Sequence, residues 1–487
     1  MERRPDASPD PPSSVRAAFD PEAFRHAGRR LVDQLADHLV RAGSRAEAAV
    51  LPNASPAQAL EAWPGSFPPG AGQVSVEDLF ARVLAGSNHL HDPRYVGHQV
   101  TAPLPLAALA DLVAALLNNS MAVYEMGPVA TAMEQRVLRF LADSLGLGAA
   151  ADGVLTSGGS IGNLTALLAA RQAKAGFDAW REGASAGPPL AILASEQTHY
   201  CVRRAAAILG LGEAGVVEVA VDERFRMRPG DLPAALERAR ARGRRVIAVV
   251  ASAGSTAAGA FDPLRPIADF CAAHDLWLHV DGAHGGAAAL SPRTRHLVEG
   301  VGRADSVVVD AHKMMLMPAL VTAVLYRDGS RAWGAFAQDA SYLFHANEDA
   351  WADVGTRTLE CTKKMLSLKL YATLSVYGTQ MFGDYVANAF DLARRFAARI
   401  AAAPDFELAV EPECNIVCFR HVLAGTDDLD ALQARIRAHV VASGAFYLVQ
   451  TRLRGALWLR TTLINALTTD DDLSALLDAL RAAARGA

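Results

Sequence analysis

The sequence lacks an apolar run that is long enough, and free enough of charge, to cross a membrane as a helix. The nearest candidate, residues 102–117, is interrupted by Asp111, whereas a spanning helix needs about 20 apolar residues. The first residues, MERRPDASPDPPSS, also lack the apolar centre of a signal peptide. We therefore expect no membrane partner, no secretion and a cytoplasmic location.

Cysteine is scarce, and its spacing forms no paired motif. The five cysteines show no C-x-x-C spacing, so the pattern fits a reducing compartment better than a disulfide framework or a zinc site. We expect no metal. The chain also lacks a basic run, and its net charge of −5 is mild. Both features argue against a nucleic acid as partner.

The length of 487 residues exceeds what one hydrophobic core usually organises, so we expect two or more packed units. Residues 1–18 are rich in Pro, Ser, Asp and Arg and are expected to lack fixed structure. A helical N-terminal segment at 19–95 follows, and Asp20-Pro21 is typical of a helix start. The remaining predicted units are a large domain at 96–370 and a smaller one at 371–487.

Strands and helices alternate between about residues 150 and 330. This order predicts an α/β fold, with a mainly parallel sheet that carries helices on both faces. From about Cys361 the pattern changes to a long helical region, followed by short strands and a final helix. We interpret that part as a smaller α+β domain that closes over the site.

Two short apolar strands end abruptly on polar residues. One, at 278–280, is followed by Asp281, and the other, at 306–309, leads to Lys313. Apolar strands of this kind suit a parallel sheet covered on both faces, and ligands bind beyond the carboxyl ends of such strands. Either residue alone could be a solvated charge at a strand end. Together they are the two anchors that pyridoxal phosphate requires, an amine for its aldehyde and a carboxylate for its ring nitrogen.

A glycine-rich turn, LTSGGSIGN, opens a predicted helix that runs to about Lys174. The N-terminus of a helix offers unpaired N–H groups and a positive dipole end, which suit a phosphate. Taken alone, such a turn is a weak signal, because a plain junction between loop and helix has the same composition.

These motifs together resemble the group II pyridoxal-phosphate-dependent amino acid decarboxylases. The resemblance is carried by HVDGAHGG, SVVVDAHKMM, the GGS turn, SEQTHYCVRRAA and VYEMGPVATAME. It implies the type I fold of pyridoxal-phosphate enzymes, and a homodimer in which residues 19–95 clasp the other subunit. It also implies conversion of an L-amino acid to its amine and carbon dioxide. The stretch GTRTLECTKKM favours glutamate, aspartate, cysteine sulfinate or 2,4-diaminobutyrate over an aromatic substrate.

The resemblance assigns roles residue by residue. Lys313 would bind the cofactor covalently, Asp281 would hold the ring nitrogen protonated, and His199 would stack on the ring. Tyr342, in SYLFH, would return a proton to the α-carbon. The other cofactor contacts that we expect are Gly159, Ser160, Asn163, Thr256, Ala283 and His312.

Substrate contacts are expected from Arg460, in LWLRTTLINALTTDDD, and from Gln99, in YVGHQ. By composition alone, Arg460 could equally form a surface ion pair, and Tyr342 could be an ordinary packed aromatic residue. The sequence departs from the family at Asp310, where an asparagine is common, and at His284, where an aromatic residue is common. A carboxylate at 310 would repel a phosphate unless it turns away or a neighbour neutralises it.

Three other functions remain open on the sequence. The chain could be an aromatic amino acid decarboxylase, or an aminotransferase or aldehyde-forming enzyme of the same fold. It could also be a catalytically silent scaffold. Substrate choice depends on a few contacts worth roughly 1–3 kcal/mol each, which the sequence does not resolve.

Overall fold

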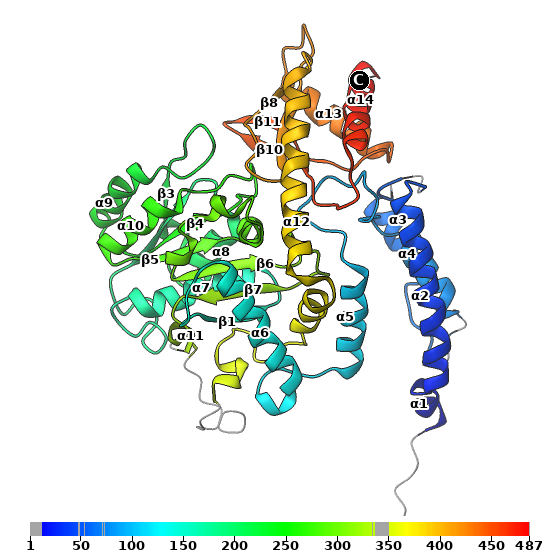
Figure 1. The fold of residues 1–487 in the computed structure, drawn as a ribbon, viewed down its shortest axis with the longest axis horizontal. Helices are drawn as coiled ribbons and strands as arrows, with labels where there is room; N and C mark the ends of the chain where they lie inside the picture. Colours follow the sequence, from blue (N-terminus) through cyan, green and yellow to red (C-terminus); the bar gives the residue numbers. More distant parts are fainter. Residues whose placement is uncertain are drawn as a thin grey trace, which may run out of the picture.

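A seven-stranded sheet forms the centre of the large domain (Figure 1). The computed structural model describes residues 12–46, 49–52, 54–70, 72, 74–333, 335–336 and 350–486. The strand order is β1-β7-β6-β5-β4-β2-β3, and β7 runs opposite to the six other strands of this sheet in the described chain. The strands are β1 (Asp152–Thr156), β2 (Leu190–Ser195), β3 (Val216–Val219), β4 (Arg245–Ser252), β5 (Trp277–Asp281), β6 (Ser306–Asp310) and β7 (Thr322–Tyr326).

Both faces of this sheet are covered by helices. Successive strand residues point to opposite faces, so Val249 and Val307 join one core cluster while Val250 and Val308 join another. The first cluster includes residues of α6 (Pro128–Ser144), α9 (Leu232–Ala241) and α10 (Leu264–His274). The second includes residues of α7 (Gly159–Lys174), α8 (Tyr200–Ile208) and α11 (Ser330–Trp333). Burial on both faces explains why these strands are apolar throughout.

Short 3₁₀ turns connect many of these elements. They are η1 (Tyr124–Met126), η2 (Glu213–Gly215), η3 (Pro229–Asp231), η4 (Gly285–Leu290), η5 (Arg295–Val298), η6 (Val301–Arg303), η7 (Ala350–Ala352) and η8 (Val354–Thr356). The helix α5 (Pro105–Leu117) packs against the long helix α12 (Ser367–Ala402). Gly378 interrupts α12 with a φ of 76°, so the helix changes direction on its way to the smaller domain.

The smaller domain is an antiparallel sheet in the order β10-β11-β9-β8, packed against two helices. Its strands are β8 (Phe406–Leu408), β9 (Ile416–His421), β10 (Val449–Leu453) and β11 (Ala456–Thr462), and its helices are α13 (Leu429–Ala442) and α14 (Asp470–Gly486). A third core cluster fills the space between them and the end of α12. Figure 1 shows this domain above the large one, with α12 rising into it.

The N-terminal helices lie beside the body rather than within it (Figure 1). They are α1 (Ser13–Ala18), α2 (Pro21–Gly43), α3 (Pro56–Glu61) and α4 (Val76–Ala85). Asp20 caps α2 by accepting a hydrogen bond from the N–H of Glu22 at 3.0 Å. Arg45, just after α2, fixes this segment to the smaller domain through two bonds to Asp472, at 2.6 and 2.7 Å.

The expected architecture is confirmed: a mostly parallel sheet with helices on both faces, plus a smaller antiparallel domain. The expectation of no fixed structure before residue 19 is wrong for residues 13–18, which form α1. The segment SSVRAA contains two alanines, the residue with the highest helix propensity, and the Pro- and Asp-rich composition of its surroundings masked that preference. Across the described ranges, no helix is long and apolar enough to cross a membrane.

A buried ion pair ties β1 to the segment that precedes α12. Lys363 donates to Glu134 Oε1 and to the carbonyl of Leu155, each at 2.5 Å, and the N–H of Leu155 donates to Glu134 at 3.0 Å. The side chains of Lys363 and Glu134 are only 3% and 0% exposed, so neither charge could be hydrated if its partner were removed. Burial is the main cause that lowers the pKa of Lys363. Since β1 leads directly into the glycine-rich turn, this ion pair helps to hold the turn in place.

We expect Lys363→Met to destabilise the protein by about 3–5 kcal/mol, because it leaves the Glu134 carboxylate buried without a counter-charge. The double variant Lys363→Met/Glu134→Gln should recover much of this loss. A matched control is Lys174→Met, which removes a lysine from an ion pair with Asp275, itself 91% exposed, and should cost less than about 1 kcal/mol. Urea unfolding of the variants measures these differences. Equal losses for Lys363→Met and Lys174→Met would contradict the assignment.

Candidate active site

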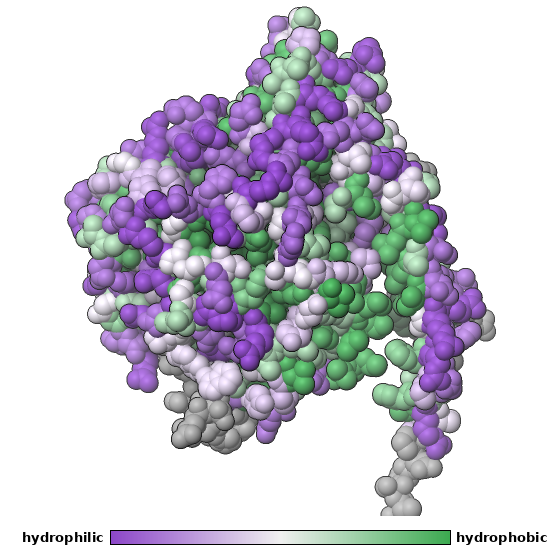
Figure 2. Space-filling model, viewed as in Figure 1, coloured by the Kyte–Doolittle hydropathy of each residue, from purple (hydrophilic) through white to green (hydrophobic). Residues whose placement is uncertain are grey.

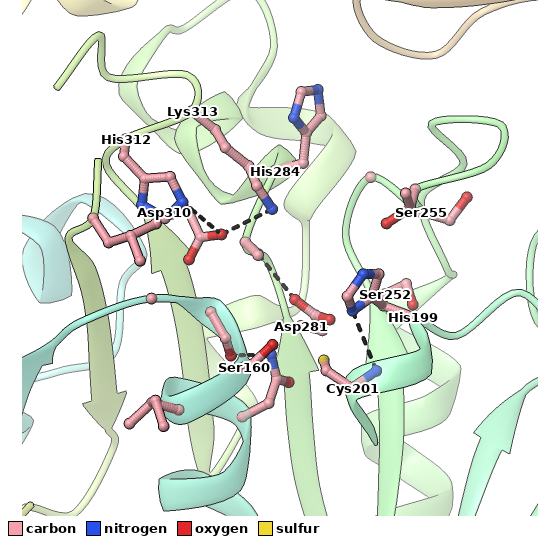
Figure 3. Close-up of a pocket in the computed structure, with 18 of the residues that line it drawn as sticks. Ser160, His199, Cys201, Ser252, Ser255, Asp281, His284, Asp310, His312 and Lys313 are labelled. Atoms are coloured by element: carbon pink, nitrogen blue, oxygen red, sulfur yellow. Dashed lines mark hydrogen bonds and ion pairs between the residues drawn. The ribbon is translucent and has the colours of Figure 1, made fainter. Parts of the chain in front are cut away.

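A cavity of about 260 Å³ lies where β4, β5 and β6 end. Asp281 is the last residue of β5, and Lys313 follows β6, the neighbouring strand. Figure 3 shows the two side chains in the same cavity, with Ser160 at the start of α7. Nine of the residues predicted from the sequence line it: Lys313, Asp281, Ala283, His199, Gly159, Ser160, Asn163, Thr256 and His312.

The ammonium of Lys313 is held by Asp310, three residues earlier. Its Nζ lies 2.8 Å from Asp310 Oδ2, and the carboxylate is 2% exposed. Thr322, opposite Asp310 on β7, donates its hydroxyl to Asp310 Oδ1 at 2.5 Å. Burial alone would lower the pKa of Lys313, but the charges of Asp310 and Asp281 outweigh burial and raise it. The carboxylate of Asp310, which stands where an asparagine is common in the family, is therefore neutralised by Lys313.

Asp281 keeps its carboxylate available to the cavity. It accepts a hydrogen bond from the N–H of Ala283 at 3.1 Å and is 9% exposed. In the part of the chain that the structure describes, no arginine or lysine lies within ion-pair distance of it. A buried carboxylate without a cationic partner is costly, so it is suited to a ligand with a protonated nitrogen.

His199 is held in one orientation at the start of α8. Its Nδ1 accepts a hydrogen bond from the N–H of Cys201 at 3.3 Å, which places the proton of the neutral ring on Nε2. Burial lowers the pKa of His199, although the nearby Asp281 carboxylate opposes that effect. The ring is therefore a neutral, flat surface beside Asp281 (Figure 3).

The glycine-rich turn presents the N-terminus of α7 to the cavity. Gly158 has a φ of 125°, a conformation that side chains rarely allow. A Cβ on Gly159 would lie 2.9 Å from Asp310 Oδ2, so glycine is also required there. The first N–H groups of a helix have no partner within it. Glu360 accepts hydrogen bonds from the N–H and the hydroxyl of Ser157, so its carboxylate is directed at the base of the turn.

The predicted substrate residues lie outside this cavity's lining. Arg460, on β11, is 5% exposed, and its Nε and Nη2 are buried without a partner among the described residues. Its charge lowers the pKa of His284, which lines the cavity, and of His98, the neighbour of Gln99, although burial is the larger cause for both. The Nε2 of Gln99 is also buried and unpartnered within the described ranges. Tyr342 lies outside the residues that the structure describes.

Several lining residues were not predicted from the sequence. Ser252 ends β4, and the strand-end rule that identified Asp281 would also have found it. Cys201 enters from the first turn of α8, and burial is the main cause that raises the pKa of its thiol. His284 donates from Nε2 to Asn415 Oδ1 at 2.7 Å, and burial lowers its pKa to about 3. The sequence marked His284 only as a departure from the family, because its contact with Asn415, like the entry of Cys201, depends on how separate segments pack.

The groups in the cavity match the chemistry of pyridoxal phosphate. An amine and an unpaired carboxylate stand at the ends of adjacent strands, a neutral imidazole lies beside them, and free N–H groups of a helix start are available for a phosphate. No group of three His, Cys, Asp or Glu residues suited to a metal ion occurs among the described residues. Lys313, Asp281, His199 and the turn at Gly159 would therefore hold the cofactor.

Comparison with known proteins gives the same answer. Residues 59–422 match the family model described as the pyridoxal-dependent decarboxylase conserved domain. Human cysteine sulfinic acid decarboxylase is 36% identical over 353 residues, which cover 72% of this chain and 71% of the human protein. L-2,4-Diaminobutyrate decarboxylase of Rhizobium meliloti is 34% identical and covers 82% of this chain and 78% of its own.

A solved structure extends the likeness to the whole fold. The crystal structure of mouse CSAD superposes with a TM-score of 0.88 at 31% identity, and covers 96% of this chain and 99% of that one. The cavity segments at residues 157–163, 199, 281–284 and 310–313 all lie within the region matched by the family model. The chain belongs to the pyridoxal-dependent decarboxylase family.

Proposed function

We propose that this pyridoxal-phosphate-dependent amino acid decarboxylase acts on an acidic L-amino acid, such as cysteine sulfinate, aspartate or glutamate. The observation that carries the substrate class is Arg460, whose guanidinium is buried with two nitrogens unpaired in the described part of the chain. A buried cation that lacks an anion is strongly unfavourable. The α-carboxylate of any substrate could satisfy it, and so could a second acidic group, whereas the side-chain ammonium of diaminobutyrate could not. The proposal places the second acidic group there, because the α-carboxylate has to leave as uncharged carbon dioxide.

The roles of the cofactor residues follow from their positions. Bound pyridoxal phosphate supplies an aldehyde that reacts with amines and a ring that withdraws electrons from the α-carbon. Lys313 would attach the cofactor and release it to the substrate amine, with Asp310 holding its ammonium meanwhile. Asp281 would keep a proton on the ring nitrogen, which makes the ring a better electron acceptor. His199 would support the face of the ring, and the N–H groups of Gly159 and Ser160 would bind the phosphate.

Tyr342 is our candidate for the acid that returns a proton to the α-carbon after carbon dioxide leaves. This role rests on the resemblance of the SYLFH segment to the catalytic loop of the family. General acids of this kind accelerate a step by about 10²–10⁴-fold. Without the acid, protonation of the α-carbon slows and other reactions at that carbon compete with it, so the product changes as well as the rate.

A homodimer is the proposed assembly, supported by an exposed apolar surface on α5. Leu109, Leu112, Val113, Leu116 and Leu117 are each 45–67% exposed, and Figure 2 shows the apolar surface that they form. Contiguous apolar surface of this kind marks an interaction site.

The N-terminal segment at 19–95 is the proposed clasp between subunits. Two apolar residues of α2 stay uncovered within one chain, since Phe24 is 52% and Leu35 is 39% exposed. In the fold of one chain, α2 packs mainly on α4. A second subunit would cover these residues. We also propose that the large domain spans residues 96–370 and the smaller domain residues 371–487.

We also propose that the protein works in the cytoplasm. All five cysteines carry free thiols in the structure, and four of them are buried. Burial raises the pKa of Cys271 and of Cys414 to about 12, which keeps them protonated and unreactive. Thiols that form no disulfide are typical of a reducing compartment.

The proposed activity is tested with a panel of substrates. The enzyme, reconstituted with pyridoxal phosphate, should release carbon dioxide from cysteine sulfinate, aspartate or glutamate faster than from 2,4-diaminobutyrate or tyrosine. Arg460→Gln should lower kcat/KM for the acidic substrate by about 10- to 100-fold, since a hydrogen bond to a charged group contributes roughly 1.5–3 kcal/mol. The control Arg452→Gln, on the exposed side of β10, should have no such effect.

Each outcome of the panel has a definite meaning. Faster release from diaminobutyrate would overturn the acidic substrate while leaving decarboxylation in place. Keto acid or aldehyde products would indicate the aminotransferase or aldehyde-forming alternatives. Absence of any product, together with no borohydride-stable attachment of the cofactor to Lys313, would indicate a silent scaffold.

We expect Tyr342→Phe to reduce amine formation by at least tenfold and to divert product toward an aldehyde, because the α-carbon then lacks its proton donor. Separation of amine and aldehyde by chromatography measures the ratio. A variant that forms amine at the wild-type rate would show that Tyr342 has no such role.

The apolar surface on α5 is tested by Leu112→Glu/Leu116→Glu. Two charges in an apolar interface are costly, so size-exclusion chromatography with light scattering should show a shift from dimer to monomer. Leu423→Glu changes an equally apolar, 43% exposed residue on the smaller domain and should leave the mass unchanged. A wild-type protein that is monomeric would refute the dimer.

A further inference from the structure

A chain of hydrogen bonds runs under the active site, from the sheet to the phosphate-binding turn. Trp277 Nε1 donates to Ser306 Oγ at 2.8 Å, and Ser306 Oγ lies 2.9 Å from His279 Nδ1. His279 Nε2 lies 2.9 Å from Asn163 Oδ1, and Asn163 Nδ2 donates to the carbonyl of Gly159 at 2.9 Å. All four side chains are at most 2% exposed.

The two ends of this chain, together with a neutral imidazole, determine every proton in it. A carbonyl oxygen can only accept, so the amide nitrogen of Asn163 must face Gly159 and its oxygen must face His279. The imidazole therefore donates from Nε2, and because burial lowers the pKa of His279 to about 4 the ring is neutral and accepts at Nδ1. Ser306 must then donate its hydroxyl proton to His279 and accept from Trp277, whose indole can only donate.

The position of His279 in the sheet explains why the chain reaches the site. His279 lies two residues before Asp281 on β5, so both side chains point to the same face. It pairs in register with Ser306 on β6, and α7 packs on this face of the sheet. The imidazole thus fills the space between the strand that carries Asp281 and the helix whose first turn lines the cavity.

We propose that His279 is a positioning residue for the cofactor phosphate: through Asn163 it fixes the Gly159 carbonyl, so that the first N–H groups of α7 face the cavity. Gly159 and Ser160 line the cavity, while the oxygen of Gly159 is held by the Asn163 amide. A rotated peptide there would turn an oxygen toward the phosphate and remove a donor. Asn163 therefore acts on the cofactor through Gly159.

Two amide variants of His279 separate the two halves of the chain. The amide nitrogen of glutamine reaches as far as Nε2, so His279→Gln can still donate to Asn163. Asparagine reaches only as far as Nδ1, so His279→Asn can contact Ser306 but not Asn163. The two variants have the same polarity and differ in one methylene group, which makes each the control of the other.

Binding is measured on apo-enzyme with two probes, pyridoxal phosphate and pyridoxal, which differ only in the phosphate. For His279→Asn we expect the Kd of pyridoxal phosphate to rise at least tenfold while the Kd of pyridoxal changes less than threefold. His279→Gln should restore most of the affinity for pyridoxal phosphate. Asn163→Ala cuts the chain at its other end and should reproduce the result of His279→Asn.

The contrast between the probes decides the proposal. An unchanged Kd for pyridoxal phosphate in both His279→Asn and Asn163→Ala would overturn it. Equal weakening of both probes would also overturn it, because that is the effect of a general loss of structure. If His279→Asn does not fold, Asn163→Ala decides alone. Since no substrate is present, the result does not depend on whether the enzyme prefers acidic amino acids.

Discussion

Asp281 and Asp310 are the last residues of two adjacent strands, and only Asp310 forms an ion pair with Lys313. Lys313 lies 2.8 Å from Asp310, while among the described residues the N–H of Ala283 is the sole hydrogen-bond donor to the carboxylate of Asp281. If the ammonium paired with Asp281 instead, the carboxylate needed by the ring nitrogen would be occupied. The turn from residue 310 to 313 therefore lets Lys313 pair with Asp310. It leaves the carboxylate of Asp281, on the adjacent strand, free for the ring nitrogen.

The smaller domain supports the walls of the cavity from outside, through contacts with the loops that line it. Cys418, on β9, donates its thiol to the carbonyl of Ala257 at 3.2 Å, directly after Thr256. Asn415 accepts from His284 at 2.7 Å. Thr256 and His284 line the cavity, so the loops around it are fixed by contacts from two packed units. Movement of one domain against the other would disturb the site, which favours a rigid junction between them.

Much of this arrangement was predictable because it follows from local rules. The uninterrupted apolar character of the strands and their alternation with helices indicated a buried parallel sheet, and the strand-end rule placed Asp281 and Lys313 at one edge. The partner of Lys313 was not predictable: Asp310 looked like a source of repulsion until Thr322, from β7, and the lysine itself were placed beside it. The role of His279 was hidden for the same reason, since its partners Ser306 and Asn163 are remote in sequence.

The proposed function assigns cofactor binding and substrate choice to different parts of the molecule. The groups for the cofactor stand on strand ends and a helix start of the large domain, where packing on both faces of the sheet holds them rigidly. Arg460 stands on β11 of the smaller domain, and two of its guanidinium nitrogens are buried without a partner among the described residues; under the proposed function, a substrate anion would pair with them. A division of this kind lets pocket contacts change substrate preference without disturbing the cofactor site. It also fits the relatives of this chain, which are decarboxylases named for different substrates.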